Sequence, residues 1–312
     1  FNEIKEIFSC NNENDLLAEF FYLVANLYSS QDEYEQSNFY LNISYFLNKK
    51  FKINLSLMAD NYFLNENYDQ SLKVLQLFNS KDDLYYWFKI KQEAKIITEK
   101  KNKDEALTYI EINFKNIKNP STKVLFDFAT IYKNSKKYEK AIELYTSVIN
   151  IMDKDDLNYA DLLYRRGGSF ERIGKYDKSD KDLLDALKII PNNSYVLNYL
   201  AYSWLERNQN INKAILMLEK AYKENENDPY IIDSVGWGYF LVGKYNDAEK
   251  YMRRALELMP NDPIVNDHYG DILWKLNRKI QAQYFWNSVL KMDDAEKEMI
   301  EKIKVKLING LS

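Results

Sequence analysis

The stretch that decides the fold runs from Pro229 to Asp262 and reads PYIIDSVGWGYFLVGKYNDAEKYMRRALELMPND. Its first half places apolar and small residues three and four positions apart, the spacing of one helix face: Ile232, Val235, Gly236 and Tyr239. Its second half repeats this spacing with Ala248, Met252 and Ala255. Gly243 and Lys244 stand between the halves and Pro260 follows the second, so the stretch predicts two helices joined by a tight turn.

The same pattern recurs along the chain. In each unit a small residue on the first helix is followed by a small residue near the start of the second: Ala25 and Ser37, Ala59 and Ser71, Ala94 and Ala106, Ala129 and Ala141, Gly167 and Ser179, Ala201 and Ala214, Gly236 and Ala248, Gly270 and Ala282. Seven of these eight pairs are twelve residues apart and one is thirteen, and the second members advance by 34, 35, 35, 38, 35, 34 and 34 residues. A period of this length is typical of a repeat array in which each unit buries its apolar face on its neighbours.

The order of large and small residues in Pro229–Asp262 resembles the tetratricopeptide repeat, and the resemblance covers nearly the whole chain. It implies an all-α fold, a right-handed superhelical solenoid of about eight helix-turn-helix repeats, and a role in protein recognition. We expect residues 1–14 to hold the second helix of a truncated preceding repeat. Residues 15–153 should form units one to four, residues 154–292 units five to eight, and residues 293–312 a capping helix, all in one continuous solenoid.

Three places depart from the repeat. Unit three carries Glu93 where a large apolar residue is expected and Asn113 where a small one is expected. Between units four and five the additional residues fall within 151–158, which we interpret as a longer loop, with a hinge as the alternative. Asp293–Asp294 should cap the last helix, whose apolar face covers the final unit through Ala295, Met299, Ile303 and Leu307.

The small residues should mark the points where paired helices cross. Packed helices approach to about 8 to 10 Å, where only Gly, Ala or Ser fits. Gly236, Ala248 and Ala255 are the predicted contacts in the quoted stretch. Trp204 and Trp286, at large positions of the repeat, are predicted to lie in the core.

Composition excludes several classes of function. The 43 Lys and Arg against 47 Asp and Glu give a net charge of -4, so nucleic-acid binding is not expected. Cys10 is the only cysteine, which excludes an internal disulfide and a cysteine-based metal cluster. No run of about eighteen apolar residues predicts a transmembrane segment. The chain opens on Phe1 rather than methionine, which suggests that a preceding segment could carry a signal peptide or lipid anchor.

The sequence offers little for catalysis, and we predict no cofactor and no metal. His268 is the only histidine and, beside Asp267 on a first helix, is predicted to be a groove or surface residue. Zinc-protease, nucleophile-elbow and phosphate-loop motifs are missing. The acidic pairs Asp82–Asp83 and Asp155–Asp156 stand at expected helix starts, where capping explains them.

One face of the first helices in units six to eight combines aromatic residues with carboxylates: Tyr195, Asn198, Tyr202, Glu206, Tyr230, Asp233, Trp237, Phe240, Asp267, Asp271 and Trp274. In the resembled family these positions line a concave surface. Exposed aromatic groups of this kind usually mark a binding surface, so we expect a groove for a partner segment with an apolar anchor and a basic residue. The alternative is that these side chains contact the adjacent turn of the array or the capping helix. Tyr230, Asp233, Trp237 and Phe240 are predicted not to be needed for stacking.

A narrower resemblance covers residues 196–309, including VLNYLAYSWLER and NDHYGDILWKLNRKIQAQYFWNSVLKM. These phrases resemble the last repeats of proteobacterial envelope tetratricopeptide proteins, some of them outer-membrane lipoproteins that deliver substrates to a C-terminal-processing protease. The resemblance implies a bacterial adaptor in the periplasm or at the outer membrane, although Cys10 has no lipobox before it.

Three hypotheses about function follow. The first is a non-enzymatic scaffold or adaptor that binds a protein or peptide partner in its groove. The second is an architectural module of a larger enzyme or complex. The third is intrinsic catalysis. A clamp for chaperone tails is disfavoured, because neither Tyr22 and Asn26 nor Lys91 and Lys95 reproduce the Lys and Asn pattern of that subclass.

Overall fold

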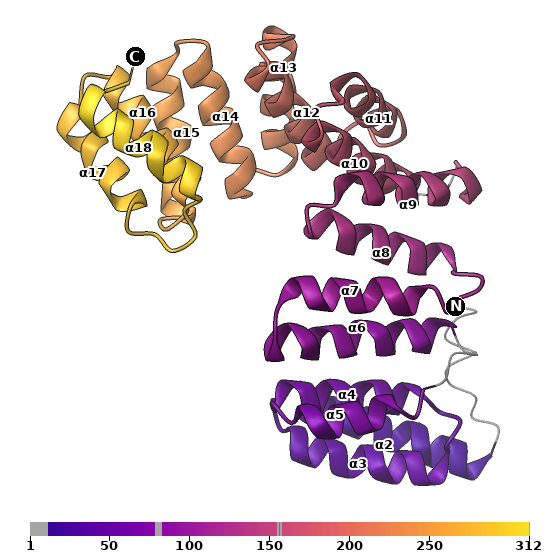
Figure 1. Ribbon diagram of the computed structural model, residues 1–312. Helices are drawn as coiled ribbons and strands as arrows, with labels where there is room; N and C mark the ends of the chain where they lie inside the picture. Colours follow the sequence, from indigo (N-terminus) through magenta and orange to yellow (C-terminus); the bar gives the residue numbers. More distant parts are fainter. Residues whose placement is uncertain (1–11, 79–82, 155, 157, 312) are drawn as a thin grey trace. The chain divides into compact units, whose positions relative to one another are not determined.

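The computed structural model describes residues 12–78, 83–154, 156 and 158–311, and in that part the chain forms seventeen helices and no strand (Figure 1). The helices are α2 (Glu13–Ser29), α3 (Tyr34–Leu47), α4 (Ile53–Leu64), α5 (Tyr68–Leu75), α6 (Asp83–Lys100), α7 (Lys103–Phe114), α8 (Thr122–Asn134), α9 (Tyr138–Ile151), α10 (Asn158–Arg172), α11 (Tyr176–Ile189), α12 (Ser194–Glu206), α13 (Ile211–Glu224), α14 (Pro229–Leu241), α15 (Tyr245–Leu258), α16 (Pro263–Lys275), α17 (Lys279–Val289) and α18 (Lys297–Asn309). This confirms the all-α class and the helix-turn-helix units. Among the described helices, none has both the length and the apolar character needed to cross a bilayer.

The chain divides into two compact units, residues 1–136 and residues 137–312. In the first unit α2 packs on α3, α4 on α5 and α6 on α7. In the second, α10 packs on α11, α12 on α13, α14 on α15 and α16 on α17. The division falls between α8 and α9, within the fourth predicted repeat, and the predicted domain boundaries remain predictions.

Each packed pair meets at the predicted small residues. Ala248 and Ala255 on α15 are completely buried. A Cβ added to Gly236 on α14 would lie 3.2 Å from the backbone nitrogen of Met252 and 3.3 Å from the carbonyl oxygen of Ala248, so the two backbones approach closely there. The large positions are core as predicted, with Trp204 and Trp286 almost fully buried. The crossings therefore depend on side-chain size at one position of each helix.

Two crossings of the first compact unit, α2–α3 and α4–α5, contain hydroxyl groups. Ser37 Oγ on α3 donates to the carbonyl oxygen of Ala25 at 2.8 Å, and Ser71 Oγ on α5 donates to that of Ala59 at 2.9 Å. Asn61 Nδ2 on α4 donates to Ser37 Oγ at 2.7 Å, which links two consecutive repeats. In the degenerate third repeat, the hydroxyl of Tyr109 donates to the carboxylate of Glu93, so the polar residue at this large position is paired.

The turns between paired helices also keep the repeat register. Seven of the eight turns contain a residue with positive φ: Asp32, Glu66, Lys136, Gly174, Asn208, Gly243 and Asn277. The described turn between α6 and α7 contains none. Gly174 and Gly243 adopt this left-handed conformation without a Cβ penalty, and asparagine tolerates it better than most residues. The turn geometry is thus shared even where the residue type is not.

The capping helix α18 is present but begins later than predicted. It starts at Lys297 after Glu296, which makes no side-chain cap, and Asp293–Asp294 lie in a turn before it. The capping prediction for this acidic pair is therefore wrong. Ile303 on α18 is completely buried in the core that contains Trp286 and Val289. The helix covers the end of the second compact unit, as a terminal cap should.

Some of the predicted features fall on residues outside the described ranges. Cys10 and most of the truncated helix over residues 1–14 are among them, and so are Asp82 and Asp155. Within residues 12–14, Asn12 caps α2 by accepting from the backbone nitrogen of Asp15 at 3.0 Å. The longer connection between units four and five lies between the end of α9 and the start of α10, and its role as a hinge remains a prediction.

Candidate functional site

The first helices of the second compact unit, α10, α12, α14 and α16, border a cavity of about 410 Å³. Five predicted groove residues line it: Asn198, Tyr202, Glu206, Tyr230 and Asp233. Tyr230 is 64% exposed, and Tyr195, outside the lining, is also well exposed. Sequence reasoning missed Glu171, Arg172, Tyr199 and Ser203 as part of this wall. Glu171 could have been found, because it precedes Glu206 by 35 residues, one repeat period.

Three carboxylates of this wall, from Glu171, Glu206 and Asp233, each contact a neighbouring first helix. Glu171 Oε2 on α10 accepts from the Tyr199 hydroxyl on α12 at 3.1 Å. Glu206 Oε1 on α12 accepts from Trp237 Nε1 on α14 at 2.8 Å. We call these contacts first-helix ties. They show that the acidic residues do part of the stacking as well as facing the cavity.

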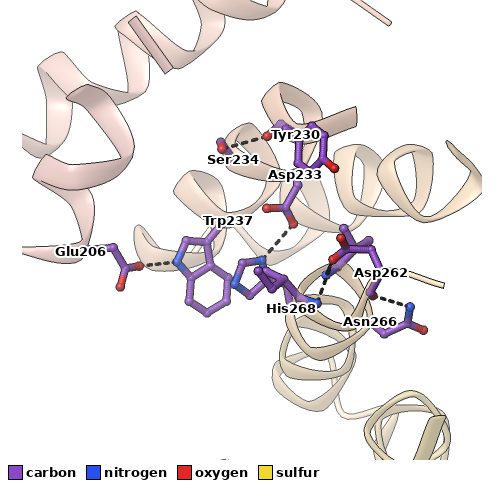
Figure 2. Close-up of polar contacts among 10 residues, drawn as sticks. Glu206, Tyr230, Asp233, Ser234, Trp237, Asp262, Asn266 and His268 are labelled. Atoms are coloured by element: carbon purple, nitrogen blue, oxygen red, sulfur yellow. Dashed lines mark hydrogen bonds and ion pairs between the residues drawn. The ribbon is translucent and has the colours of Figure 1, made fainter. Parts of the chain in front are cut away.

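The tie between α14 and α16 corrects two predictions (Figure 2). His268 Nδ1 lies 2.9 Å from Asp233 Oδ1, and the His268 ring stacks on Trp237 with centroids 4.0 Å apart and an interplanar angle of 12°. His268 is buried, so its assignment to the surface or groove is wrong. Trp237 also stacks on Phe240 with centroids 4.7 Å apart. Asp233, Trp237 and Phe240 therefore contribute to packing, against expectation.

Electrostatics at this tie favour a charged imidazole. Burial opposes the charged form, but the charge of Asp233 and its hydrogen bond, together with Asp267 and Asp271, outweigh burial and raise the pKa of His268 above its ordinary value. A protonated His268 can donate from Nδ1 to Asp233. The imidazole is engaged in this contact and in the stack on Trp237, and the pair is best described as an internal ion pair.

The three predicted groove residues of unit eight are covered by the capping helix. Lys306 Nζ on α18 lies 2.7 Å from Asp267 Oδ1 and 2.8 Å from both Asp271 oxygens. Trp286 Nε1 donates to Asp271 Oδ1 at 3.0 Å. Trp274 packs on Trp286, and a Cβ at Gly310 would clash with its ring. Here the alternative interpretation, contact with the cap, is the one that the structure shows.

The pKa of Asp271 reflects this burial. Burial, followed by the charge of Asp267, raises the pKa of the Asp271 carboxyl to about 6, against the opposing effects of Lys306 and His268. In the cavity wall, burial followed by the charges of Glu206 and Asp233 raises the pKa of the Tyr202 hydroxyl, so Tyr202 stays protonated at neutral pH.

Two buried polar atoms of the cavity wall lack a hydrogen-bond partner among the described residues. They are Asn198 Oδ1 and Ser203 Oγ, both on α12, and Ser203 is 6% exposed. An unsatisfied buried polar group costs about 1 to 3 kcal/mol. The wall therefore combines tyrosine rings and carboxylates with two unsatisfied polar atoms, which are closed to solvent here and would meet a ligand once their side chains turn toward it. No group of three or more candidate metal-ligating side chains occurs in the described ranges.

Comparisons with known proteins concern the repeat region. A family model described as tetratricopeptide repeat matches residues 88–294. The TPR repeat-containing protein PA4667 of Pseudomonas aeruginosa is 38% identical over 117 residues, which is 38% of this chain and 19% of that protein. The match thus spans about a fifth of the length of this relative.

One solved structure supports the fold. The crystal structure of TTC0263, a thermophilic TPR protein of Thermus thermophilus, is similar with a TM-score of 0.52 at 15% identity, over 60% of this chain and all of that chain (100%). MamA from Desulfovibrio magneticus RS-1 gives a TM-score of 0.47 at 16% identity, over 56% of this chain and 97% of that one. At these identities the likeness to TTC0263 supports the arrangement of paired helices and nothing about partners.

Proposed function

We propose, from the premise that this chain belongs to the tetratricopeptide repeat family, that it is a non-enzymatic scaffold which binds a segment of a partner protein between α10, α12, α14 and α16. The family is generally one of protein-interaction scaffolds, so protein partners are the expected ligands. The proposal adds the place of binding, which is the cavity on the first helices of the second compact unit.

The observation that carries the proposal is the composition of the cavity wall. Tyr199, Tyr202 and Tyr230 offer ring surface for an apolar anchor. Asn198 Oδ1 and Ser203 Oγ offer hydrogen-bonding capacity that the described part of the chain leaves unused. A partner segment would cover the tyrosines and satisfy these two atoms, which would recover free energy that the unliganded chain lacks.

An adaptor role in a bacterial envelope, with delivery of substrates to a C-terminal-processing protease, is the finer form of this proposal. It rests on the resemblance of residues 196–309 to envelope repeat proteins. The Pseudomonas aeruginosa relative supports the repeat region alone, since its printed name states no partner. Co-purification of a protease with this chain from the envelope of its source cell, and its loss on Tyr230→Ala, is the expected result.

The second candidate function is an architectural module within a larger enzyme or complex. The observation that favours it is the length of the Pseudomonas aeruginosa relative, of which the match covers 19%. Under this alternative the cavity would be filled by another part of the same assembly. A contact in trans with a separate protein would argue against it.

Site-specific photocrosslinking tests the place of binding. A benzophenone amino acid is placed at Tyr230, in the cavity wall, or at Tyr284 on α17, which is as exposed but lies outside the wall. We expect crosslinked partner from position 230 and little from position 284 in cells that express the chain natively. Equal yields at the two positions would show that capture is not confined to the groove.

A further inference from the structure

The cavity between α10, α12, α14 and α16 is rich in hydrogen-bond acceptors. Its wall holds four carboxylates, from Glu171, Glu206, Asp233 and Asp262, and one cationic side chain, Arg172. Arg172 Nε lies 3.7 Å from Glu171 Oε2, so its charge is directed at that carboxylate. Of the other three carboxylates, Asp233 is paired with His268 and Asp262 caps α16. Glu206 has no ion pair within the described residues, and a cationic group is its complementary ligand.

The internal contacts leave part of this acceptor capacity unused. Trp237 Nε1 donates to Oε1 of Glu206, while Oε2 of Glu206 accepts no hydrogen bond from the described residues. Asn198 Oδ1 and Ser203 Oγ are buried without a partner in the same part of the chain. Asn198, Ser203 and Glu206 are all on α12, and all three line the cavity.

The same chain already shows how such a face holds a lysine. On α16, Lys306 of the capping helix places its ammonium between Asp267 and Asp271 at 2.7 and 2.8 Å. Its Nζ also lies 5.9 Å from the centre of the Trp286 ring. Two carboxylates of the first helix α16 and the Trp286 ring of α17 thus surround a lysine side chain that is 17% exposed.

We propose that the cavity binds a lysine side chain of the partner segment, with its ammonium directed to Glu206, Asn198 Oδ1 and Ser203 Oγ and its methylene stem on Tyr202 and Tyr230. This rests on the proposed function and names the residue that the groove selects. An ammonium has three donors that can reach three single acceptors, whereas a guanidinium is matched by paired oxygens in one plane. The two tyrosine rings supply apolar and cation–π contact to the stem and the charge.

The probe is a random decapeptide library made in five versions, with Lys, Nε-acetyl-lysine, norleucine, Arg or Glu fixed at the central position. Each version is passed over the immobilised full chain and the retained fraction is measured. We expect the Lys version to be retained about tenfold more than the acetyl-lysine and norleucine versions, because these keep the stem and remove the charge. The Arg version should fall between them.

Variants locate the effect in the cavity. Glu206→Gln keeps an oxygen for Trp237 Nε1 but removes the charge, and Ser203→Ala removes a hydroxyl that has no partner in the described chain. Both should lower retention of the Lys version without changing the melting temperature. The charge-matched control is Glu143→Gln on α9, whose exposed side chain lies outside the wall and which should retain the Lys version fully.

Three other outcomes would each overturn the proposal, and the retention pattern tells them apart. Equal retention of the Lys, acetyl-lysine and norleucine versions, lost on Tyr230→Ala, would leave a groove that does not select lysine. Equal loss in Glu206→Gln and Glu143→Gln would show non-specific attraction to an acidic protein. Retention of none of the libraries would overturn the lysine site and also count against the proposed function.

Discussion

The first two helix pairs of the first compact unit, α2–α3 and α4–α5, meet through serine hydroxyls, whereas most pairs in the second unit meet through alanine and glycine. Ser37 and Ser71 each donate to the carbonyl of the small residue opposite, twelve positions earlier. Ala248 and Gly236 occupy the same positions without a polar atom. The repeat therefore requires a small side chain at the crossing, and a hydroxyl is accepted when the opposite backbone carbonyl receives it.

Ser179 in the second unit marks the limit of this rule. It is completely buried opposite Gly167, and its Oγ finds no partner within the described residues. Serine fits at that crossing because its side chain is small, although its hydroxyl makes no hydrogen bond with a described residue. Steric fit and hydrogen bonding are thus separate contributions to the crossing, and each can be measured by itself.

The largest expected effect is at Asn61, the centre of the polar network in the first unit. Asn61 is completely buried, donates to Ser37 Oγ and Asn38 Oδ1, and accepts from Ser29 Oγ at 2.7 Å. Asn61→Leu should lower the free energy of unfolding by about 2 to 4 kcal/mol, because several buried groups lose their partner together. Urea unfolding measures it, with the exposed Asn65→Leu as control. A cost equal to that of the control would mean that the network is dispensable.

The next effect tests steric fit in the apolar crossing. Ala248→Leu should destabilise the second unit by about 1 to 3 kcal/mol, because the backbone of α14 at Gly236 leaves no space for a larger side chain. Hydrogen exchange of peptides from α14 and α15 localises the change. Ala248→Ser, which copies Ser71, should cost less than about 1 kcal/mol. If serine were as harmful as leucine, polarity rather than size would govern this crossing.

A pH dependence should distinguish the two units. The folded pKa of Asp271, about 6, lies above its ordinary value of 3.8, and the pKa of His268 is also raised above 6.5. Both groups bind protons more tightly in the folded state, so their stabilisation is present at low pH. That of Asp271 is lost as pH rises through about 6, and that of His268 as pH rises above 6.5 through its folded pKa.

Between pH 5 and pH 8 the end of the second unit should therefore lose about 1 to 3 kcal/mol of its free energy of unfolding. In the first unit the Ser and Asn side chains at the crossings do not titrate, so any dependence there comes from Asp60 on α4, whose pKa burial raises against the opposing charge of Lys95. Hydrogen exchange at the two pH values, corrected for intrinsic rates, measures both units in one sample. Asp271→Asn should flatten the dependence, since an amide oxygen can still accept from Trp286 Nε1. An unchanged slope in this variant would remove Asp271 as its origin.

The smallest expected effect comes from comparing two buried serines at the same repeat position, Ser71 and Ser179. Ser71→Ala should cost about 0.5 to 1.5 kcal/mol, because it removes one buried hydrogen bond. Ser179→Ala should be neutral within about 0.5 kcal/mol or slightly stabilising, because that hydroxyl has no partner in the described chain. Both changes delete one oxygen at the same repeat position, and thermal melting compares them directly. Equal costs would contradict the assignment of a hydrogen bond to Ser71 alone.

Much of this architecture can be predicted from residue spacing, because a small residue recurring every 34 or 35 positions has a steric cause that does not depend on its neighbours. The first-helix ties could not be predicted in that way. Asp233 and His268 are 35 residues apart and Glu206 and Trp237 are 31 apart, so their contact depends on side-chain direction across a repeat interface. A search for complementary residues near one repeat period apart would have found both.

The groove could be predicted only in part. Tyr230 and Tyr202 were recognised because aromatic rings on the unpacked face are visible in the sequence. The burial of Asp271 was missed because it needs Lys306, which lies on a helix outside the repeat pattern. The start of that helix was placed too early because aspartates serve both as helix caps and as turn residues.

The stack of His268 on Trp237 also gives the cavity a natural optical signal. A charged imidazole 4.0 Å from an indole quenches its emission, and the same indole donates to Glu206 in the cavity wall. A ligand that binds Glu206 would therefore change the environment of the Trp237 indole, and with it the intensity of its emission. In a variant that keeps Trp237 as its sole tryptophan, emission intensity would follow both the protonation of His268 and the occupancy of the groove, with no attached dye.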